Sequence, residues 1–173
     1  MKKLLIVFYF IFICNFLLAH PHIFFENMFI LKITSDEIVI NLNLILDEMN
    51  SLLIKERNDD YELYKNVFNN FKFNYNGKIL DNKVIDKKIK FNEDNLILDI
   101  ILKYQINIKK DDRLIISIYD KEYFYDYDYD NNSFDIKNNT NLKITTNFKE
   151  NKKEAYYYNM IYPKEFEVVI NEK

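Results

Sequence analysis

The chain has 173 residues, of which 49% are hydrophobic and 29% are charged, and its net charge at pH 7 is −3. These proportions are typical of a globular domain, and the lack of a basic excess argues against a nucleic-acid partner. A chain of this length accommodates one domain with a single apolar core.

Residues 1–19 have the order of a secretory signal peptide. Two lysines precede an apolar stretch over residues 4–18, and the small residue Ala19 follows it. The apolar stretch is slightly shorter than the ~20 residues that a transmembrane helix requires, which favours cleavage over retention as an anchor. We therefore expect cleavage after Ala19 and a periplasmic or secreted mature protein over residues 20–173. The only cysteine, Cys14, would be lost.

The two histidines of the chain, His20 and His22, directly follow Ala19. If His20 becomes the mature N-terminus, its α-amine and imidazole can chelate one metal ion, and His22 adds a second imidazole. Pro21 has no amide proton to lose, which excludes the square-planar copper and nickel site that binds deprotonated amides. Imidazole suits zinc, copper and nickel alike. The alternative interpretation is a tail with two solvated histidines.

Strand patterns dominate the rest of the chain. Residues 23–33 and 37–46 are rich in β-branched and aromatic types and predict two strands joined by a turn. Asn76-Gly77 is the strongest hairpin signal. Further strands are predicted at 72–75, 78–80, 84–91, 96–106, 113–119, 142–148 and 166–170. Because the connections are short, we expect the strands to pair antiparallel.

Residues 47–71 change to a helical period. The apolar spacing predicts two short helices with a break between Arg57 and Asp60, the second helix being capped by Asp59 or Asp60. Together these patterns predict an α+β fold. We expect an antiparallel β-rich, sandwich-like single domain over residues 20–173 with a short helical insertion.

Candidate carboxylate ligands lie near the histidines in the predicted elements. Strand alternation would place His20, His22 and Glu26 on one face. Asp47-Glu48 is a pair of adjacent carboxylates, although such a pair is more often a helix cap. An added carboxylate would favour zinc or nickel over Cu(I).

The acidic and tyrosine-rich segment 119–130 offers a further candidate. If it is extended, Asp126, Asp128 and Asp130 share one face and the tyrosines share the other. For Asp128 and Asp130 a solvated acidic edge is the preferred interpretation. Asp120, together with Asp126, is the candidate for a metal ligand or for a group that orients one.

Enzymatic signatures are weak. The chain has no Gly-rich phosphate loop, the mature form would have no cysteine, and no third histidine remains to act as the base of a serine triad. We therefore expect neither an enzyme nor a small organic substrate. A third hypothesis is an oxidative copper enzyme that uses the N-terminal histidines.

Three motifs in order resemble those of the DUF1007 family of uncharacterised secreted proteins. They are AHPHIFFE at 19–26, LDEMNS at 46–51 and LIISIYDKEYFYD at 114–126. The family start is matched by His20, His22 and Glu26, its F-D-E-M-like segment by residues 46–49 with Leu in place of Phe, and its Y-D-x-x-Y-like segment by Tyr119, Asp120 and Tyr123. The calcium-like loop of many relatives shrinks here to residues 57–60, so calcium is not expected.

This resemblance implies a periplasmic role beside a metal permease of the nickel/cobalt or zinc type. Our first hypothesis is a divalent-metal-binding accessory protein that hands Zn, Ni or Cu to an inner-membrane metal permease. Its predicted ligands are His20, His22, Glu26, Asp47, Glu48 and Asp120. The second hypothesis is a metal-independent structural or interaction module that docks a membrane partner.

Overall fold

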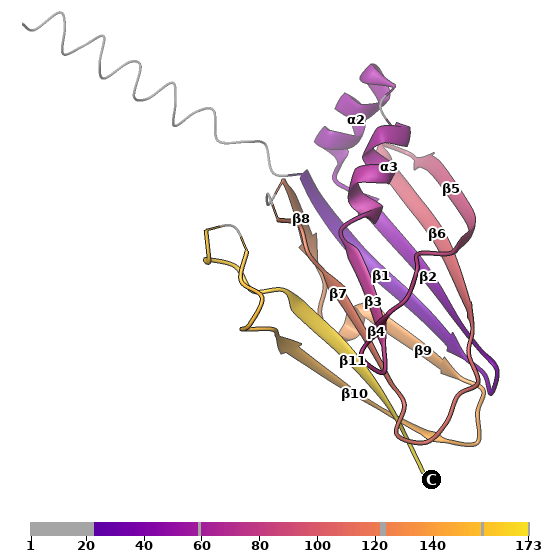
Figure 1. The fold of residues 1–173 in the computed structure, drawn as a ribbon. Coiled ribbons are helices and arrows are strands. Elements are labelled where there is room, and N and C mark those ends of the chain that lie inside the picture. Colours follow the sequence, from indigo (N-terminus) through magenta and orange to yellow (C-terminus); the bar gives the residue numbers. More distant parts are fainter. Residues whose placement is uncertain (1–22, 59, 122–123, 157, 173) are drawn as a thin grey trace, which may run out of the picture.

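The computed structural model describes residues 23–58, 60–121, 124–156 and 158–172. These residues form two β-sheets and two short α-helices (Figure 1), so the expected β-rich α+β fold is confirmed. No helix in this part of the chain is long and apolar enough to cross a membrane. The predicted signal peptide and both histidines lie outside the described residues.

The six-stranded sheet has the strand order β5-β6-β2-β1-β8, and β9 also pairs with β1. Its strands are β1 (Ile23–Ile33), β2 (Glu37–Leu46), β5 (Val84–Asn92), β6 (Asn95–Gln105), β8 (Tyr125–Asp128) and β9 (Phe134–Asn138). Every second residue of β2 is buried, as is nearly every second residue of β1, because side chains alternate between the two sides of a strand. One side of this sheet therefore faces the core, and we call the other its outer face.

The five-stranded sheet has the order β10-β11-β7-β3-β4 and is antiparallel throughout. Its strands are β3 (Phe71–Tyr75), β4 (Lys78–Ile79), β7 (Arg113–Ile118), β10 (Lys143–Glu150) and β11 (Lys164–Asn171). One hydrophobic core contains residues of both sheets. Phe134 of β9 stacks on Phe166 of β11 with the ring centroids 3.5 Å apart, and Phe73 of β3 lies 6.3 Å from Tyr104 of β6. Aromatic contacts thus join the sheets.

Two helices, α2 (Glu48–Arg57) and α3 (Asp60–Phe68), lie at one end of the sheets (Figure 1). The predicted break between them is confirmed, and Asn58 ends α2 in the left-handed conformation with φ of 57°. Asp59 lies outside the described residues, and Asp60 is the first residue of α3. The helix α3 buries Leu63, Val67 and Phe68.

Three of the apolar side chains of α2 do not face the core. Met49, Leu52 and Leu53 are exposed, and the buried residues are Asn50 and Ser51. The Ser51 hydroxyl donates to the carbonyl of Leu46 at 3.2 Å and accepts from the amide of Leu96 at 2.8 Å. The helix is therefore fastened to β2 and β6 by hydrogen bonds at a buried serine, because this serine satisfies two backbone groups at the sheet end.

β1 pairs in parallel with β8 and β9, which lie one after the other along the same edge of β1. The expectation of antiparallel pairing is wrong for these strands. Residues 131–138, for which no strand was predicted, contain the 3-10 helix η1 (Asn131–Ser133) and β9. Where β8 leaves β1, the Asn27 side-chain amide donates to the carbonyls of Phe25 and Asp128 at 3.2 and 2.9 Å. These bonds hold the end of β8 against β1.

A buried carboxylate joins the β3–β4 hairpin to the start of β7. The predicted turn is confirmed, since Asn76 and Gly77 have φ values of 52° and 82°. Asp112, which is 9% exposed, accepts hydrogen bonds from the Tyr75 hydroxyl, from Asn76 Nδ2 at 2.7 Å and from the Lys109 amide at 2.6 Å. The turn and the strand are thus fixed to each other through one side chain.

Candidate functional site

The start of β1 lies between the end of β2 and the start of β8. The Ile23 amide donates to the Phe124 carbonyl at 3.1 Å, and the Asp47 amide donates to the Phe24 carbonyl at 3.4 Å. Tyr125, the first residue of β8, is paired with Ile23. The chain therefore enters the sheet at Ile23 with residue 47 on one side and residue 124 on the other.

Asp47 caps helix α2 at this position. Its Oδ1 accepts from the Asn50 amide at 3.0 Å, and its Oδ2 accepts from Asn50 Nδ2 at 2.8 Å. The helix-cap interpretation is confirmed for this residue. Glu48 is the first residue of the helix and is exposed, and its negative charge is favourable there because the helix N-terminus carries a partial positive charge. Asp47 can bind a metal only by sharing or giving up a capping bond.

Asp120 approaches the start of β1 from the other side. It follows β7 and is 6% exposed, and its Oδ2 accepts from the Tyr125 amide at 2.8 Å. Because Tyr125 is paired with Ile23, this carboxylate is held at the same end of the sheet as Asp47. The structure thus brings two of the predicted ligands to the two neighbours of β1, which the sequence alone could not establish.

Glu26 lies farther along β1, on the outer face of the six-stranded sheet. Its side chain is exposed, and its register partner across the parallel pair is Asp128. In the described part of the chain, no three His, Cys, Asp or Glu residues are close enough together to hold a metal ion. The four predicted carboxylates therefore do not form a site by themselves, and the histidines that would complete it lie outside the described residues.

Among its described residues, the acidic and tyrosine-rich segment forms a strand only at β8. Within this strand the predicted alternation holds, since Tyr127 is buried and Asp128 is exposed. The strand ends there, and Asp130 instead caps η1, where its Oδ1 accepts from the amides of Asn132 and Ser133 at 2.7 and 3.2 Å. The solvated-edge interpretation therefore describes Asp128, whereas Asp130 has a local structural role.

A cavity of about 170 Å³ lies beside β8 and was not expected from the sequence. Its walls include five tyrosines, at positions 125, 127, 129, 156 and 162. The Tyr127 hydroxyl accepts from Asn70 Nδ2 at 3.0 Å, and the Tyr129 hydroxyl donates to the Lys164 carbonyl at 2.7 Å. The alternation of Tyr and Asp was the available signal, but it shows only which side chains face inward and not that they leave a cavity.

The tyrosines beside the site stay protonated. Burial raises the pKa of Tyr127 and of Tyr129 well above the usual phenol value. Burial also raises the pKa of Tyr125, with the charges of Asp120 and Glu62 adding to the effect of burial. In the absence of a bound cation, these side chains are therefore neutral hydroxyl groups at pH 7.

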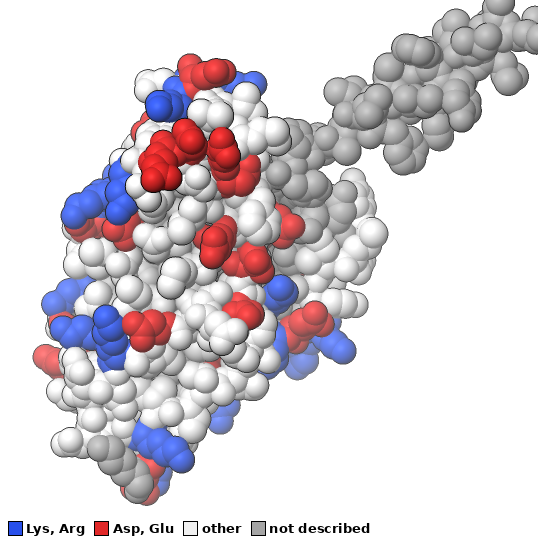
Figure 2. Space-filling view, turned by 180° about the vertical axis from the view of Figure 1, so that it is seen from behind, with Lys and Arg blue, Asp and Glu red and all other residues white. Residues whose placement is uncertain are grey.

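Acidic side chains gather at this end of the outer face. Asp126 and Asp128 of β8 pair in register with Phe24 and Glu26 of β1. Figure 2 shows Asp and Glu over the upper and middle part of this face, with Lys and Arg beside them at the top, along the left edge and toward the lower right. A cluster of one sign raises the local concentration of counter-ions, which here are cations.

Comparison of the chain with family models, with curated proteins and with solved structures found no match. The chemistry of the site is therefore argued from its own residues. These are two carboxylates that flank the start of β1, an acidic surface beside them, and a tyrosine-lined cavity.

Proposed function

We propose that the protein is a periplasmic accessory protein that binds a divalent transition metal and hands it to an inner-membrane metal permease of the nickel/cobalt or zinc type. The observation that carries this proposal is that Asp47 and Asp120 flank the start of β1. His22 is bonded to Ile23, and His20 lies within roughly 10 Å of Ile23 even along an extended chain. Both carboxylates are thus within reach of a metal held by the histidines.

The ligand set would combine the His20 amine and imidazole, the His22 imidazole and one carboxylate. We favour Asp120 as that carboxylate, because it is held at the start of β8 beside Ile23, whereas Asp47 is fixed as the cap of α2. Three nitrogens and one oxygen suit Zn or Ni better than Cu(I). Glu26 and Glu48, which are exposed, would attract the cation as part of the acidic surface.

In this role the two sheets would be a rigid, sandwich-like scaffold of a binding protein and not of an enzyme. The proposal includes the likeness to the DUF1007 family. Described residues of the three motifs lie next to one another, since Phe25 pairs with Leu46 and Ile23 pairs with Tyr125. The first motif enters β1, the second contains Asp47 and the third contains Asp120. A shared location for three separate motifs supports a common role for them.

Calorimetric titration with Zn, Ni and Cu tests the proposal. The protein that begins at His20, with its terminus confirmed by mass spectrometry, is compared with a version that has one extra N-terminal residue. We expect the extended version to lose affinity, because its His20 amine is acylated. Full affinity in the His20→Ala/His22→Ala protein would refute the site.

Metal affinity should also depend on pH. Imidazole binds metal only when it is neutral, so affinity should fall as the pH drops through about 6.5. The same titration repeated in steps across this range measures the effect. An affinity that is constant across the range would exclude histidine ligands.

The alternative is a metal-independent module that docks a membrane partner. One observation favours it, namely the exposure of Met49, Leu52 and Leu53, which are 68%, 43% and 42% exposed on one side of α2. A purified permease that binds equally well with chelator present, and equally to the double alanine variant, would support this alternative over metal delivery.

A further inference from the structure

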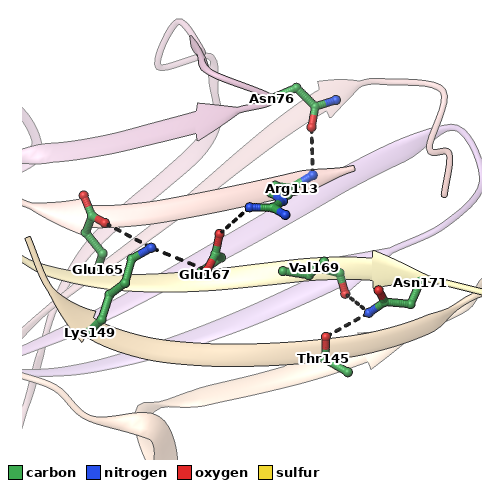
Figure 3. Close-up of polar contacts among 8 residues, drawn as sticks. All are labelled: Asn76, Arg113, Thr145, Lys149, Glu165, Glu167, Val169 and Asn171. Atoms are coloured by element: carbon green, nitrogen blue, oxygen red, sulfur yellow. Dashed lines mark hydrogen bonds and ion pairs between the residues drawn. The ribbon is translucent and has the colours of Figure 1, made fainter. Parts of the chain in front are cut away.

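Several polar side chains on the outer face of the five-stranded sheet pair with one another. On the five-stranded sheet, Glu167 pairs with Arg113 and Lys149 at 3.6 and 3.5 Å (Figure 3). Farther along β11, the Asn171 side-chain amide donates to the Thr145 hydroxyl at 2.9 Å. These polar groups thus find partners within the chain, whereas Oδ1 of Asn74 on β3 accepts no hydrogen bond within the described residues.

The outer face of the six-stranded sheet has apolar side chains in its middle. Among them Met28 is 47% exposed. The others are half-buried except Ile97, which is 8% exposed. The apolar set comprises Met28, Ile30, Val39, Ile45, Ile97 and Ile101. Such a face gains free energy if a second apolar surface covers it.

Two polar groups on this face also lack partners. Asn41 lies opposite Ile30 on β1 and Ile101 on β6, and its Oδ1 is shielded from water. This oxygen and Oδ1 of Asp99 accept no hydrogen bond within the described residues. A buried oxygen without a hydrogen-bond donor destabilises the fold, because its lost hydration is not replaced.

The strand register orders the charges of this face into rows. The row at the start of β1 contains Glu26, with Asp128 beside it on β8. The row at the end of β1 contains Lys32, with Lys137 beside it on β9 and Lys103 two strands away. Along β1 and its β8–β9 edge the face is thus acidic at one end and basic at the other. The strands farther from this edge have mixed charges, since Lys90 of β5 lies in the row of Glu26, and Asp99 and the Lys88–Asp86 ion pair lie in the middle rows. Lys103 pairs with Glu37 at 2.6 Å.

We infer that this face binds a second copy of the chain. The six-stranded sheets of the two copies pack face to face, and the two-fold axis that relates them lies between the sheets and perpendicular to the strands. This axis turns the acidic end of one copy onto the basic end of the other. Glu26 then meets Lys32 of the second copy, and Asp128 meets Lys137. A two-fold axis along the strands would instead stack the row of lysines on itself, which like-charge repulsion disfavours.

The same axis aligns the middle rows. Met28 and Asn43 share one row, and Ile30 and Asn41 share the next row. With the axis between these rows, Met28 packs on Ile30 of the second copy and Asn43 lies over Asn41 of the second copy. The Asn43 amide can then donate to the unpartnered Asn41 oxygen. A self-complementary pattern is what a two-fold interface requires.

The area of the face sets the expected strength. Five strand positions and four rows cover about 500 Å² per chain at ordinary strand spacing. The pair would therefore bury about 1,000 Å², which lies at the lower limit for a specific interface. We expect a dimer that forms reversibly as concentration rises.

Sedimentation equilibrium of the purified protein in chelator tests this inference independently of metal binding. We expect a dimer at high concentration, loss of the dimer in Met28→Glu, and an unchanged dimer in the control Ile79→Glu. Ile79 is 65% exposed on β4, in the other sheet. Thermal melting by circular dichroism should show that both variants fold, because both positions are exposed. A wild-type monomer at all concentrations, or equal dimers in both variants, would overturn the inference.

A charge exchange tests the direction of the axis. Asp128→Lys and Lys137→Asp should each weaken the dimer, because each places two like charges together. The double variant restores both pairs and should recover the wild-type dissociation constant. If the double variant is no stronger than the single ones, the two-fold axis does not cross the strands as inferred.

Discussion

The two ends of β7 each have a buried aspartate, and the two differ in what surrounds them. Asp112 precedes the strand and is 9% exposed, while Asp120 follows it and is 6% exposed. Asp112 accepts three hydrogen bonds from the hairpin and turn around it, whereas Asp120 accepts from the amide that starts β8, beside the first residue of β1. Burial alone therefore does not identify a site residue. The origin of the donors distinguishes a carboxylate that fixes a turn from one that faces the entry of the chain.

Removal of the Asp112 side chain should have the largest effect. Asp112→Ala leaves the Tyr75 hydroxyl, the Asn76 amide and the Lys109 amide without their acceptor, and we expect a loss of about 2–4 kcal/mol in the free energy of unfolding. Urea unfolding measures this loss. The control Asp94→Ala, at an exposed turn between β5 and β6, should change stability by less than about 0.5 kcal/mol. Similar losses in both variants would show that Asp112 does not fix the hairpin.

Protonation of Asp112 should remove part of the same stabilisation. Burial opposes ionisation of this carboxyl, but the hydrogen bonds from Tyr75, Asn76 and the Lys109 amide outweigh it and hold its pKa below the ordinary 3.8. A lowered pKa stabilises the fold above 3.8 and loses this contribution as the pH falls toward the folded-state value. The stability difference between wild type and Asp112→Asn should therefore be full at neutral pH and narrow in acid. Urea unfolding at several pH values measures it, and a constant difference would contradict this cause.

Loss of one of the three donors should cost less than loss of the acceptor. Tyr75→Phe removes the hydroxyl but leaves the Asn76 and Lys109 bonds in place, so we expect a decrease of about 1 kcal/mol in the free energy of unfolding. Combining Tyr75→Phe with Asp112→Ala should add little to the effect of Asp112→Ala alone. Full additivity would mean that the two side chains act separately.

At the other end of β7, the change Asp120→Asn should have the smallest effect on stability. Its effect on metal binding tests whether Asp120 belongs to the proposed site. Asp120→Asn keeps an oxygen to accept from the Tyr125 amide, so stability should fall by less than about 1 kcal/mol. Zinc affinity of the protein that begins at His20 should fall about tenfold, as for groups that bind or orient a metal ligand. Calorimetry compares this variant with the exposed control Asp81→Asn. Equal affinities would remove Asp120 from the proposed site.

Local patterns in the sequence predicted the elements well where the local chemistry is decisive. The alternation of residues 23–33 and 37–46, the helical period between 47 and 71, and the turn at Asn76-Gly77 all depend on near neighbours. The position of Asp47 beside Phe24 follows from the β1–β2 pairing in the same way.

Features that depend on distant segments were not predictable. The parallel pairing of β1 with β8 and β9 joins residues from opposite halves of the chain, and short connections gave no hint of it. The apolar spacing of α2 indicated a helix but not which side of it is buried, because the helix is held at Ser51 by groups at the ends of β2 and β6. The role of Asp112 likewise depends on the contact between the β3–β4 hairpin and the start of β7. The sequence of neither segment predicts this contact.

The parallel pairing of β1 also bears on the order in which the chain folds. The Asn27 side chain bonds to the carbonyl of Asp128, 101 positions away, and β9 lies later still. Contacts between such distant segments form late in folding, because the entropy cost of closing a long loop must be met before the contacts can form. The β1–β2 hairpin must therefore persist with one open strand edge until β8 and β9 arrive, and this interval is when the chain is most exposed to aggregation.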